Sequence, residues 1–302
     1  MDLYLPVANL SVNALVIVLL GGGVGFLSGM FGVGGGFLTT PLLIFYGIPP
    51  TVAAASAATQ VTGASVSGVL AHLDRDGVDL RMGAVLVAGG FVGSLIGAGL
   101  FELLTAWGQI DTVIAILYVA LLGSVGTIMG REAWGAFRAA KVGLPAPARK
   151  RRHHPMVANL PLRWRFYRSG LYISPLAPLI LGMIVGVLTM LLGVGGGFIM
   201  VPAMLYLLGM GTQVVVGTSL FQILFVTIAT TMVHAMTTGA VDIVLAGLLL
   251  IGSTVGAQVG ARFAQKARPE YLRLALAGIV LLVALQMAVG LFIRPDEIYT
   301  VQ

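Results

Sequence analysis

The sequence predicts an all-α polytopic membrane protein made of two inverted-topology repeats. Of its 302 residues, 58% are hydrophobic and 9% are charged, whereas a soluble domain carries about a quarter charged residues. The hydrophobic residues gather in runs long enough to cross or half-cross a bilayer, and one glycine-rich motif occurs twice. Each repeat is therefore expected to hold a glycine-turn hairpin of broken helices followed by three transmembrane helices.

Ten apolar runs are separated by the few charged residues and by turns. The runs of the first half are 10–31, 37–47, 52–72, 82–104 and 110–130. Those of the second half are 176–192, 198–208, 213–236, 240–264 and 270–292. The chain thus divides into a first membrane repeat at 1–130, a basic linker at 131–175 and a second membrane repeat at 176–302. The first ten residues lack Lys and Arg, so the first run is not expected to be a cleaved signal peptide.

The basic residues predict an orientation in the membrane. Ten of the 17 Lys and Arg residues lie in the linker, beside one acid, Glu132. The positive-inside rule places this linker in the cytoplasm, and alternating spans then bring sixteen of the 17 basic residues to that side of the inner membrane. The basic stretches 149–154 and 163–168 serve this topology, and binding of anionic lipid headgroups is the alternative.

The two halves share a motif that composition alone would not produce. The sequence GVGGGF at 32–37 recurs at 193–198, and a proline follows four residues later in both copies, as Pro41 and Pro202. Each half has five helical segments, an odd number, so the second copy must enter the membrane from the opposite side. Inverted repeats are a recurring design of transporters, and transport is therefore the leading function class.

The segments after the glycines are short. At about eleven residues and 1.5 Å per residue they span roughly 16 Å, so each is expected to be a half-helix that begins within the membrane. The first N–H groups of a helix lack an internal partner and carry partial positive charge, which favours an anion. A tight turn between packed helices is the alternative. The substrate-binding candidates here are Gly34, Gly35, Gly36, Gly195, Gly196 and Gly197.

Polar side chains inside the apolar segments are mainly hydroxyls and amides. Gln60 and Gln222 occupy corresponding positions about one helical turn after small polar residues, so both groups can face one cavity. Neutral donors would replace the hydration of an oxyanion without trapping it, which suits a carrier. The alternative for each hydroxyl is a bond to its own backbone or to a neighbouring helix. These further candidates are Gln60, Gln222, Ser56, Thr218 and Ser219.

Four ionisable residues near helix ends have two interpretations. His72 and His234 end corresponding helices at opposite membrane faces, and they are candidates for proton coupling because histidine changes charge near neutral pH. Interfacial residues without such a role are the alternative. Asp79 and Asp242 lie near helix starts, where an acid stabilises the helix dipole.

Several other function classes are excluded. The chain has no cysteine, which removes disulfides, iron–sulfur clusters and thiol nucleophiles. Its four histidines lack metal-ligand spacing, and the glycine motif matches no nucleotide-binding loop, so neither a metal nor another cofactor is expected. No catalytic constellation is visible at membrane depth, so the protein is not expected to be an enzyme. The glycine pairs at 93–97 and 256–260 are expected to be helix-packing contacts.

The paired GVGGGF…P hairpins, followed by GIPPTVAAASAATQ and by GMGTQVVVGTSLFQ, resemble the TauE/SafE family of sulfite and organosulfonate exporters. The resemblance covers about residues 15–130 and 176–292, and the basic linker is less typical of the family. It implies a secondary transporter that exports a small sulfur-containing anion, such as sulfite, sulfoacetate or a related organosulfonate, by alternating access. An anion channel and a permease for another small organic anion are the alternatives.

The resemblance also bears on partners. The expected partners are the small anionic substrate and membrane lipids, with protons as the coupling ion in some members of the family. Self-association into a homo-oligomer is left open, and no nucleic acid is expected, because the basic residues gather at the membrane face.

Overall fold

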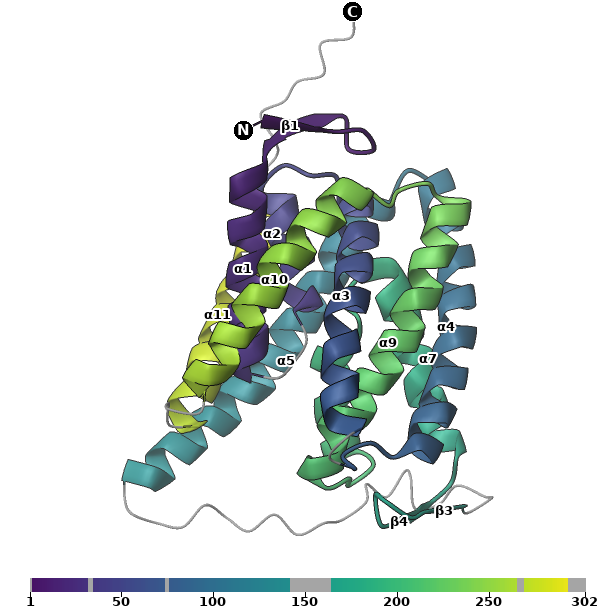
Figure 1. Cartoon of the computed structure of the whole chain (residues 1–302), viewed down its shortest axis with the longest axis vertical. Coiled ribbons are helices and arrows are strands. Elements are labelled where there is room, and N and C mark those ends of the chain that lie inside the picture. Colours follow the sequence, from purple (N-terminus) through teal and green to yellow (C-terminus); the bar gives the residue numbers. More distant parts are fainter. Residues whose placement is uncertain (1, 32–34, 74–75, 142–163, 265–268, 293–302) are drawn as a thin grey trace, which may run out of the picture.

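The computed structural model describes residues 2–31, 35–73, 76–141, 164–264 and 269–292 (Figure 1). Five helices in these ranges are long and apolar enough to cross a bilayer: Leu80–Ala106, Ile110–Gly135, Val214–Thr237, Ile243–Phe263 and Leu274–Leu291. Four shorter apolar helices accompany them, at Ala14–Met30, Gly36–Phe45, Leu176–Leu192 and Gly197–Tyr206. The predicted class, an all-α multi-pass membrane protein, is confirmed.

Each half of the described chain contains five helices that match the predicted apolar runs. In the first half these are α1 (Ala14–Phe31), α2 (Gly36–Phe45), α3 (Pro50–Leu73), α4 (Leu80–Ala106) and α5 (Ile110–Lys141). In the second half they are α7 (Leu176–Leu192), α8 (Gly197–Tyr206), α9 (Thr212–Thr237), α10 (Ile243–Ala264) and α11 (Pro269–Phe292). Helix α5 continues well past its predicted end at residue 130, because the first residues of the basic linker are rich in the good helix formers Ala, Arg and Glu.

Two β-hairpins were not predicted. Strands β1 (Asp2–Leu5) and β2 (Leu10–Asn13) pair antiparallel before α1, and β3 (Trp164–Phe166) and β4 (Leu171–Ile173) pair antiparallel before α7. Their turns hold Asn9 and Gly170 at positive φ, and these residues are as far apart in the sequence as the two glycine motifs. The hairpin is therefore the first element of each repeat, and the second one lies inside the stretch predicted as linker.

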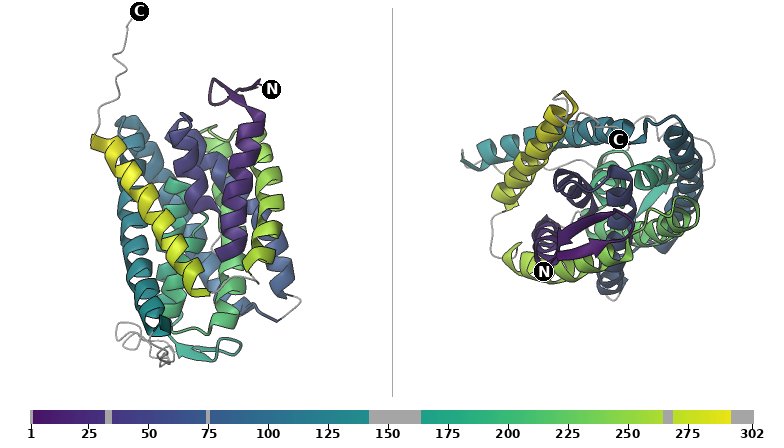
Figure 2. Two further views of the ribbon diagram at one scale, coloured as in Figure 1. Left: turned by 90° about the vertical axis from the view of Figure 1, so that its left-hand side faces the viewer. Right: turned by 90° about the horizontal axis from the view of Figure 1, so that it is seen from above.

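The main helix contacts join one half of the chain to the other. Helix α1 packs along α10, α4 along α7, α3 against α9, and α5 against α11, which cross at the edge of the bundle (Figures 1 and 2). Exchanging the halves converts the α1–α10 pair into the α7–α4 pair, whereas α3–α9 and α5–α11 are each a helix packed against its own counterpart. This interleaved arrangement is the one expected of an inverted repeat.

The strands mark the two ends of the molecule. Hairpin β1–β2 lies at one end and hairpin β3–β4 at the other (Figure 1). We call the end with β3–β4 the linker end, because the end of α5 and the turn between α3 and α4 also lie there. The described arginines Arg81, Arg138, Arg165, Arg168 and Arg262 belong to elements of this end, as the charge-based orientation requires.

Glycines allow the paired helices to approach at backbone distance. A Cβ atom at Gly93 of α4 would overlap the carbonyl oxygen of Met183 in α7, and one at Gly256 of α10 would overlap that of Gly22 in α1. Small residues are the usual means of close helix packing in membranes, where lipid and side chains are equally apolar. The predicted packing role of these two glycines is confirmed.

The close approach leads to a testable difference between glycines. We expect Gly93→Ala to destabilise the protein by about 1–3 kcal/mol, because the added methyl group forces α4 and α7 apart. Gly123→Ala in α5 is the matched control, since a Cβ there meets nothing within 4 Å and alanine favours the helix by about 0.5–1 kcal/mol. Thermal unfolding in detergent measures both, and equal melting temperatures for the two variants would contradict the packing role.

Candidate functional site

The two glycine hairpins pack directly against each other inside the bundle. The rings of Phe37 and Phe198, each next to the last glycine of its motif, stack with centroids 4.5 Å apart and planes 10° from parallel. A Cβ atom at Gly36 would lie 2.6 Å from the carbonyl oxygen of Val194. Helices α2 and α8 therefore both begin at one buried contact between the two halves. Gly34 lies outside the described residues.

The half-helices begin with N–H groups that the helices do not use. In α2 the first intrahelical bonds run from the N–H groups of Leu38 and Thr39 to the carbonyl of Gly35, at 3.1 and 3.3 Å. In α8 the corresponding bonds run from Ile199 and Met200 to Gly196, at 3.1 and 2.8 Å. The N–H groups of the last glycine and of the phenylalanine in each motif precede these ladders. Both half-helices thus direct the positive ends of their dipoles toward the same contact.

The second hairpin depends on glycine for its backbone conformation. Gly195 and Gly196 adopt φ values of 71° and 79°, which L-residues with a side chain rarely occupy. The break before them is tied to the first half, because the carbonyl of Leu192 accepts hydrogen bonds from the hydroxyls of Thr40 (3.1 Å) and Tyr118 (2.6 Å). Broken backbone inside a membrane protein needs such partners, which the opposite repeat supplies here.

Apolar side chains close over the glycines. The nearest atoms to an added Cβ are Val24 Cγ1 at Gly35, Val61 Cγ1 at Gly195, and Val185 Cγ1 at Gly196. A solute therefore reaches the glycine backbone only after these side chains have moved apart. The structure brings the two hairpins into contact with apolar side chains packed over the glycines, and a substrate-binding role for these glycines stays a prediction.

The two glutamines differ in their surroundings. The hydroxyl of Thr39 donates to Gln60 Oε1 at 3.0 Å, beside the first glycine motif. In the second repeat Met200 occupies the position of Thr39, so no equivalent hydroxyl is present. The side chain of Gln222 is fully buried (0% exposed), and among the described residues neither Nε2 nor Oε1 has a hydrogen-bond partner.

An unpaired buried amide is costly, since an unsatisfied donor or acceptor loses about 1–3 kcal/mol. The amide nitrogen of Gln222 faces the backbone of α4, because a Cβ atom at Gly90 would lie 3.3 Å from it. Gln222 is thus a buried polar group that lacks a protein partner, close to where α9 and α4 meet. Buried amides of this kind normally form hydrogen bonds, either to the protein or to a bound water or solute.

The three predicted hydroxyls have protein partners. Ser56 Oγ accepts a hydrogen bond from the N–H of Asp242 (3.2 Å), and Thr218 Oγ1 accepts one from the N–H of Asp79 (3.0 Å). Ser219 Oγ donates to the carbonyl of Val216 (2.9 Å). These contacts correspond to the alternative that the sequence left open, in which each hydroxyl bonds to the backbone of its own or a neighbouring segment.

Two buried aspartates connect the halves at opposite ends of the bundle. Asp79 caps α4 by accepting from Met82 N–H (3.1 Å), and its other oxygen accepts from the N–H of Ser169 (2.9 Å) and from the Ser169 hydroxyl. Its own N–H reaches Thr218 across the repeat boundary. We call Asp79, Ser169 and Thr218 the linker-end clamp.

The opposite end carries the corresponding arrangement. Asp242 accepts from the N–H groups of Val244 and Leu245, both at 3.1 Å, and its other oxygen accepts from Val7 N–H at 3.2 Å. Its own N–H reaches Ser56. We call Asp242, Val7 and Ser56 the opposite-end clamp. The predicted role of both aspartates at helix starts is confirmed, whereas their bonds to the other half were not foreseen.

The two histidines hydrogen-bond to helix carbonyls. His234 Nε2 lies 2.9 Å from the carbonyl oxygen of Met190, and the edge of its ring meets Phe101 with centroids 5.1 Å apart. His72 Nδ1 lies 2.9 Å from the carbonyl oxygen of Gly68. Because a carbonyl only accepts, the nitrogen that faces it carries the proton in each case. A coupling role for these residues stays a prediction.

A row of threonines joins α3 to α9 near the glutamines. Thr62 donates to Thr227 at 2.8 Å, and Thr59 donates to Thr231 at 3.4 Å. The sequence analysis did not select these residues, although each is a hydroxyl within an apolar segment. We call these four residues the threonine seam. Within the described ranges, no group of three or more His, Cys, Asp or Glu residues is placed to hold a metal ion.

Comparisons with known proteins give one family and several relatives. The family model described as Sulfite exporter TauE/SafE matches residues 17–287. The "Probable membrane transporter protein YjnA" of Bacillus subtilis (strain 168) is 28% identical over 274 residues, which is 90% of this chain and 98% of the relative. The "Probable membrane transporter protein YunE" of the same strain is 26% identical over 286 residues, covering 90% of this chain and 96% of the relative.

A further relative comes from another organism. A "Probable membrane transporter protein" of Xylella fastidiosa (strain Temecula1 / ATCC 700964) is 26% identical over 260 residues, covering 85% of this chain and 87% of the relative. No solved structure matches the chain.

The clamps lead to a prediction about stability. Loss of a helix cap costs about 0.5–2 kcal/mol. We expect Asp79→Ala to destabilise the protein by at least this amount, because the α4 cap is lost and Ser169 also loses its hydrogen-bond partner. Asp76→Asn is the matched control, since among the described residues this exposed carboxylate pairs with Arg168 at the surface, where ion pairs contribute about 0–1 kcal/mol, and asparagine tolerates its φ of 54°. Thermal unfolding compares the two, and a larger loss for Asp76→Asn would refute the clamp.

Proposed function

Because this chain belongs to the sulfite exporter TauE/SafE family, we propose that it is a secondary transporter that exports a small sulfur-containing anion by alternating access. The substrate class comprises sulfite, sulfoacetate and related organosulfonates. Its relatives carry the names of membrane transporters, and the chain itself is a multi-pass membrane protein. A transporter, and not an enzyme, is the class that these relatives support.

The observation that carries the proposal is the direct contact of the two glycine hairpins. The starts of α2 and α8 meet at Phe37 and Phe198, so the first N–H groups of both half-helices converge from opposite halves. Helix starts favour anions through these N–H groups and through the dipole. Separation of the stacked rings would expose both sets to one solute, which is the geometry an oxyanion with several oxygens needs.

The amide of Gln222, which faces Gly90 of α4, is a further candidate donor in this proposal. This amide is buried without a partner, whereas the carbonyl oxygen of Gln60 is already engaged by Thr39. The second repeat therefore offers the substrate the amide of Gln222, and the first repeat offers Gln60 Nε2, since the Thr39 bond occupies only the accepting oxygen of Gln60. All of these groups are neutral, so they compensate the hydration of an anion without holding it as tightly as a buried arginine would.

The two clamps fit the alternating-access part of the proposal. Each lies at one end of the bundle, and each joins elements of both halves. Opening toward one side breaks one clamp and leaves the other intact, so the glycine contact is reached from one side at a time. The symmetry of the clamps favours similar free-energy costs for the two openings.

Export is the direction that the membrane potential favours. Moving one negative charge out of a cell with a negative interior gains about 2.3 kcal/mol per 100 mV, so no coupling ion is needed. Uptake against the same potential would need one. Proton coupling through His72 and His234 is therefore an addition that the export mechanism does not depend on.

Flux measurements test the substrate class. Vesicles that contain the purified protein and labelled sulfite, sulfoacetate or methanesulfonate are expected to release at least one of these anions faster than protein-free vesicles. Saturation of the flux supports a carrier, and unitary currents in planar bilayers would instead indicate a channel. No release of any of the three anions above the protein-free vesicles would refute the proposed class.

Gln222→Leu tests the binding site. Loss of one hydrogen bond to a charged solute costs about 1.5–3 kcal/mol, so we expect the apparent affinity to fall about ten- to hundredfold. Thermal stability should stay equal or rise, because an unsatisfied buried amide is removed. Gln258→Leu on the exposed surface of α10 is the control and should leave flux unchanged. Unchanged flux in Gln222→Leu would exclude Gln222 from the site.

A further inference from the structure

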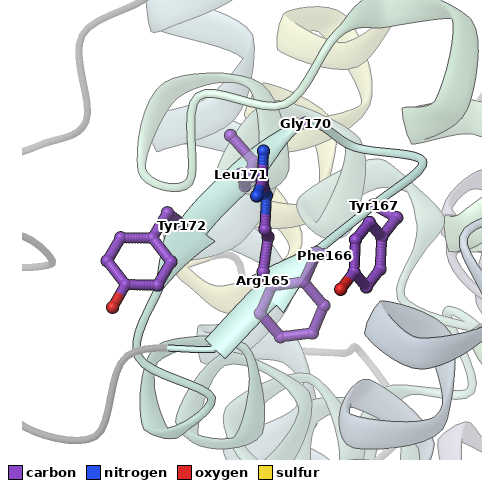
Figure 3. A pocket seen from close by; sticks show the side chains of 6 residues that line it. All are labelled: Arg165, Phe166, Tyr167, Gly170, Leu171 and Tyr172. Carbon is purple, nitrogen blue, oxygen red and sulfur yellow. The ribbon is translucent and has the colours of Figure 1, made fainter.

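A cavity lined by aromatic residues and two arginines lies between β3–β4 and α4 at the linker end. Its volume is about 580 Å3, and its walls include Arg81 of α4 and Trp164, Arg165, Tyr167 and Tyr172 of the hairpin. A second cavity of about 500 Å3 shares Arg165 and both tyrosines (Figure 3). In that view the side chain of Arg165 extends between the rings of Tyr172 and Tyr167. None of these groups takes part in the proposed transport site.

The charges in this cavity are arranged around one aromatic ring. The guanidinium carbons of Arg81 and Arg165 lie 5.2 and 5.8 Å from the centroid of Tyr167. The acids nearby are engaged elsewhere, because Asp76 pairs with Arg168 at 2.7 Å and Asp79 is occupied in the linker-end clamp. Both guanidinium groups contact the same ring and line the same cavity, so they can offer an anionic group such as a phosphate the N–H donors that guanidinium uses to bind it.

The aromatic residues place this site at a membrane surface. Trp164, Tyr167 and Tyr172 are 57%, 68% and 59% exposed, beside the start of the membrane-spanning helix α4. Tryptophan and tyrosine concentrate where the headgroups of a bilayer meet its hydrocarbon core. The arginines are therefore positioned at headgroup depth.

An apolar groove continues from this cavity along α4. Ala84 lines both this cavity and a groove of about 470 Å3 that is walled by Val87, Phe91 and Val92 of α4 and by Phe221 and Phe225 of α9. The helix rises about 16 Å from Arg81 to Val92 at 1.5 Å per residue, which is close to one leaflet of a hydrocarbon core about 30 Å thick. The groove itself follows α4 from Ala84 to Val92, about 12 Å at 1.5 Å per residue, so the cationic site and the groove together have the length of a phospholipid headgroup and the upper part of its acyl chain.

We propose that the linker end binds an anionic phospholipid, with its phosphate headgroup at Arg81 and Arg165 and one acyl chain in the groove between α4 and α9. A free oxyanion would use the arginines and leave the groove empty. The lipid contacts β3–β4 and α4, the two elements that the linker-end clamp also joins. Its binding therefore stabilises the closed arrangement at this end.

Native mass spectrometry of the full chain in detergent tests the proposal. Phosphatidylglycerol is expected to bind about tenfold more tightly than phosphatidylcholine with the same acyl chains, because two arginines attract its net negative headgroup. The double variant Arg81→Gln/Arg165→Gln should lose this preference. Arg138→Gln is the matched control, since it removes an arginine of the same end that lies over Trp134 outside the groove, and it should keep the preference. An unchanged preference in the double variant would overturn the proposal.

Two further measurements separate the sources of the anion and guard against misfolding. Glycerol 3-phosphate carries the headgroup chemistry without acyl chains, and it should not displace phosphatidylglycerol at equal concentration. Displacement would show that the arginines bind a free anion.

A Trp107→Phe/Trp134→Phe variant keeps both arginines and leaves Trp164 as the one tryptophan of the chain. Brominated phosphatidylglycerol should quench it at a lower mole fraction than brominated phosphatidylcholine, and equal quenching would contradict the proposal.

Discussion

A helix that breaks inside a membrane protein leaves backbone groups which lipid cannot satisfy, and the architecture of this chain follows from that constraint. The two breaks are buried against each other at Phe37 and Phe198, and the carbonyl of Leu192 at the end of α7 receives hydroxyls from the other half. Glycine-mediated packing of α1 with α10 and of α4 with α7 then brings the surrounding helices close enough to enclose them. The backbone groups that the proposal assigns to an anion are thus the same groups that need to be enclosed.

Much of this architecture is predictable from the sequence, because long apolar runs indicate membrane helices. The repeated GVGGGF motif with its following proline located both breaks, and the short runs after it predicted half-helices. The β-hairpins escaped prediction since strands of three or four residues leave little periodic signal beside an apolar run or within a basic one. The clamps escaped it for another reason: Asp79 and Ser169 are far apart in the sequence, and each looks complete as a local helix cap or turn residue.

The sequence did not predict the difference between the two glutamines. The sequence placed Gln60 and Gln222 as equals, yet only Gln60 has a hydroxyl partner, because Thr39 is replaced by Met200 in the second repeat. The sequence difference is visible when the motifs GGGFLTTP and GGGFIMVP are compared. Its consequence becomes clear only in the folded protein, where Thr39 hydrogen-bonds to Gln60. The backbone therefore follows a two-fold pattern while the polar chemistry does not, which gives the two halves unequal shares in any solute they hold.

The interleaving of the helices also makes each half dependent on the other. Each aspartate caps a helix of its own repeat and then bonds to the other repeat, and the main helix contacts cross the same boundary. One repeat by itself thus lacks partners for its clamp, for its first helix and for its broken backbone. A chain with a single copy would have to insert in both orientations and assemble as an antiparallel dimer to supply these partners. The covalent connection between the halves instead keeps the two copies in equal number within one molecule.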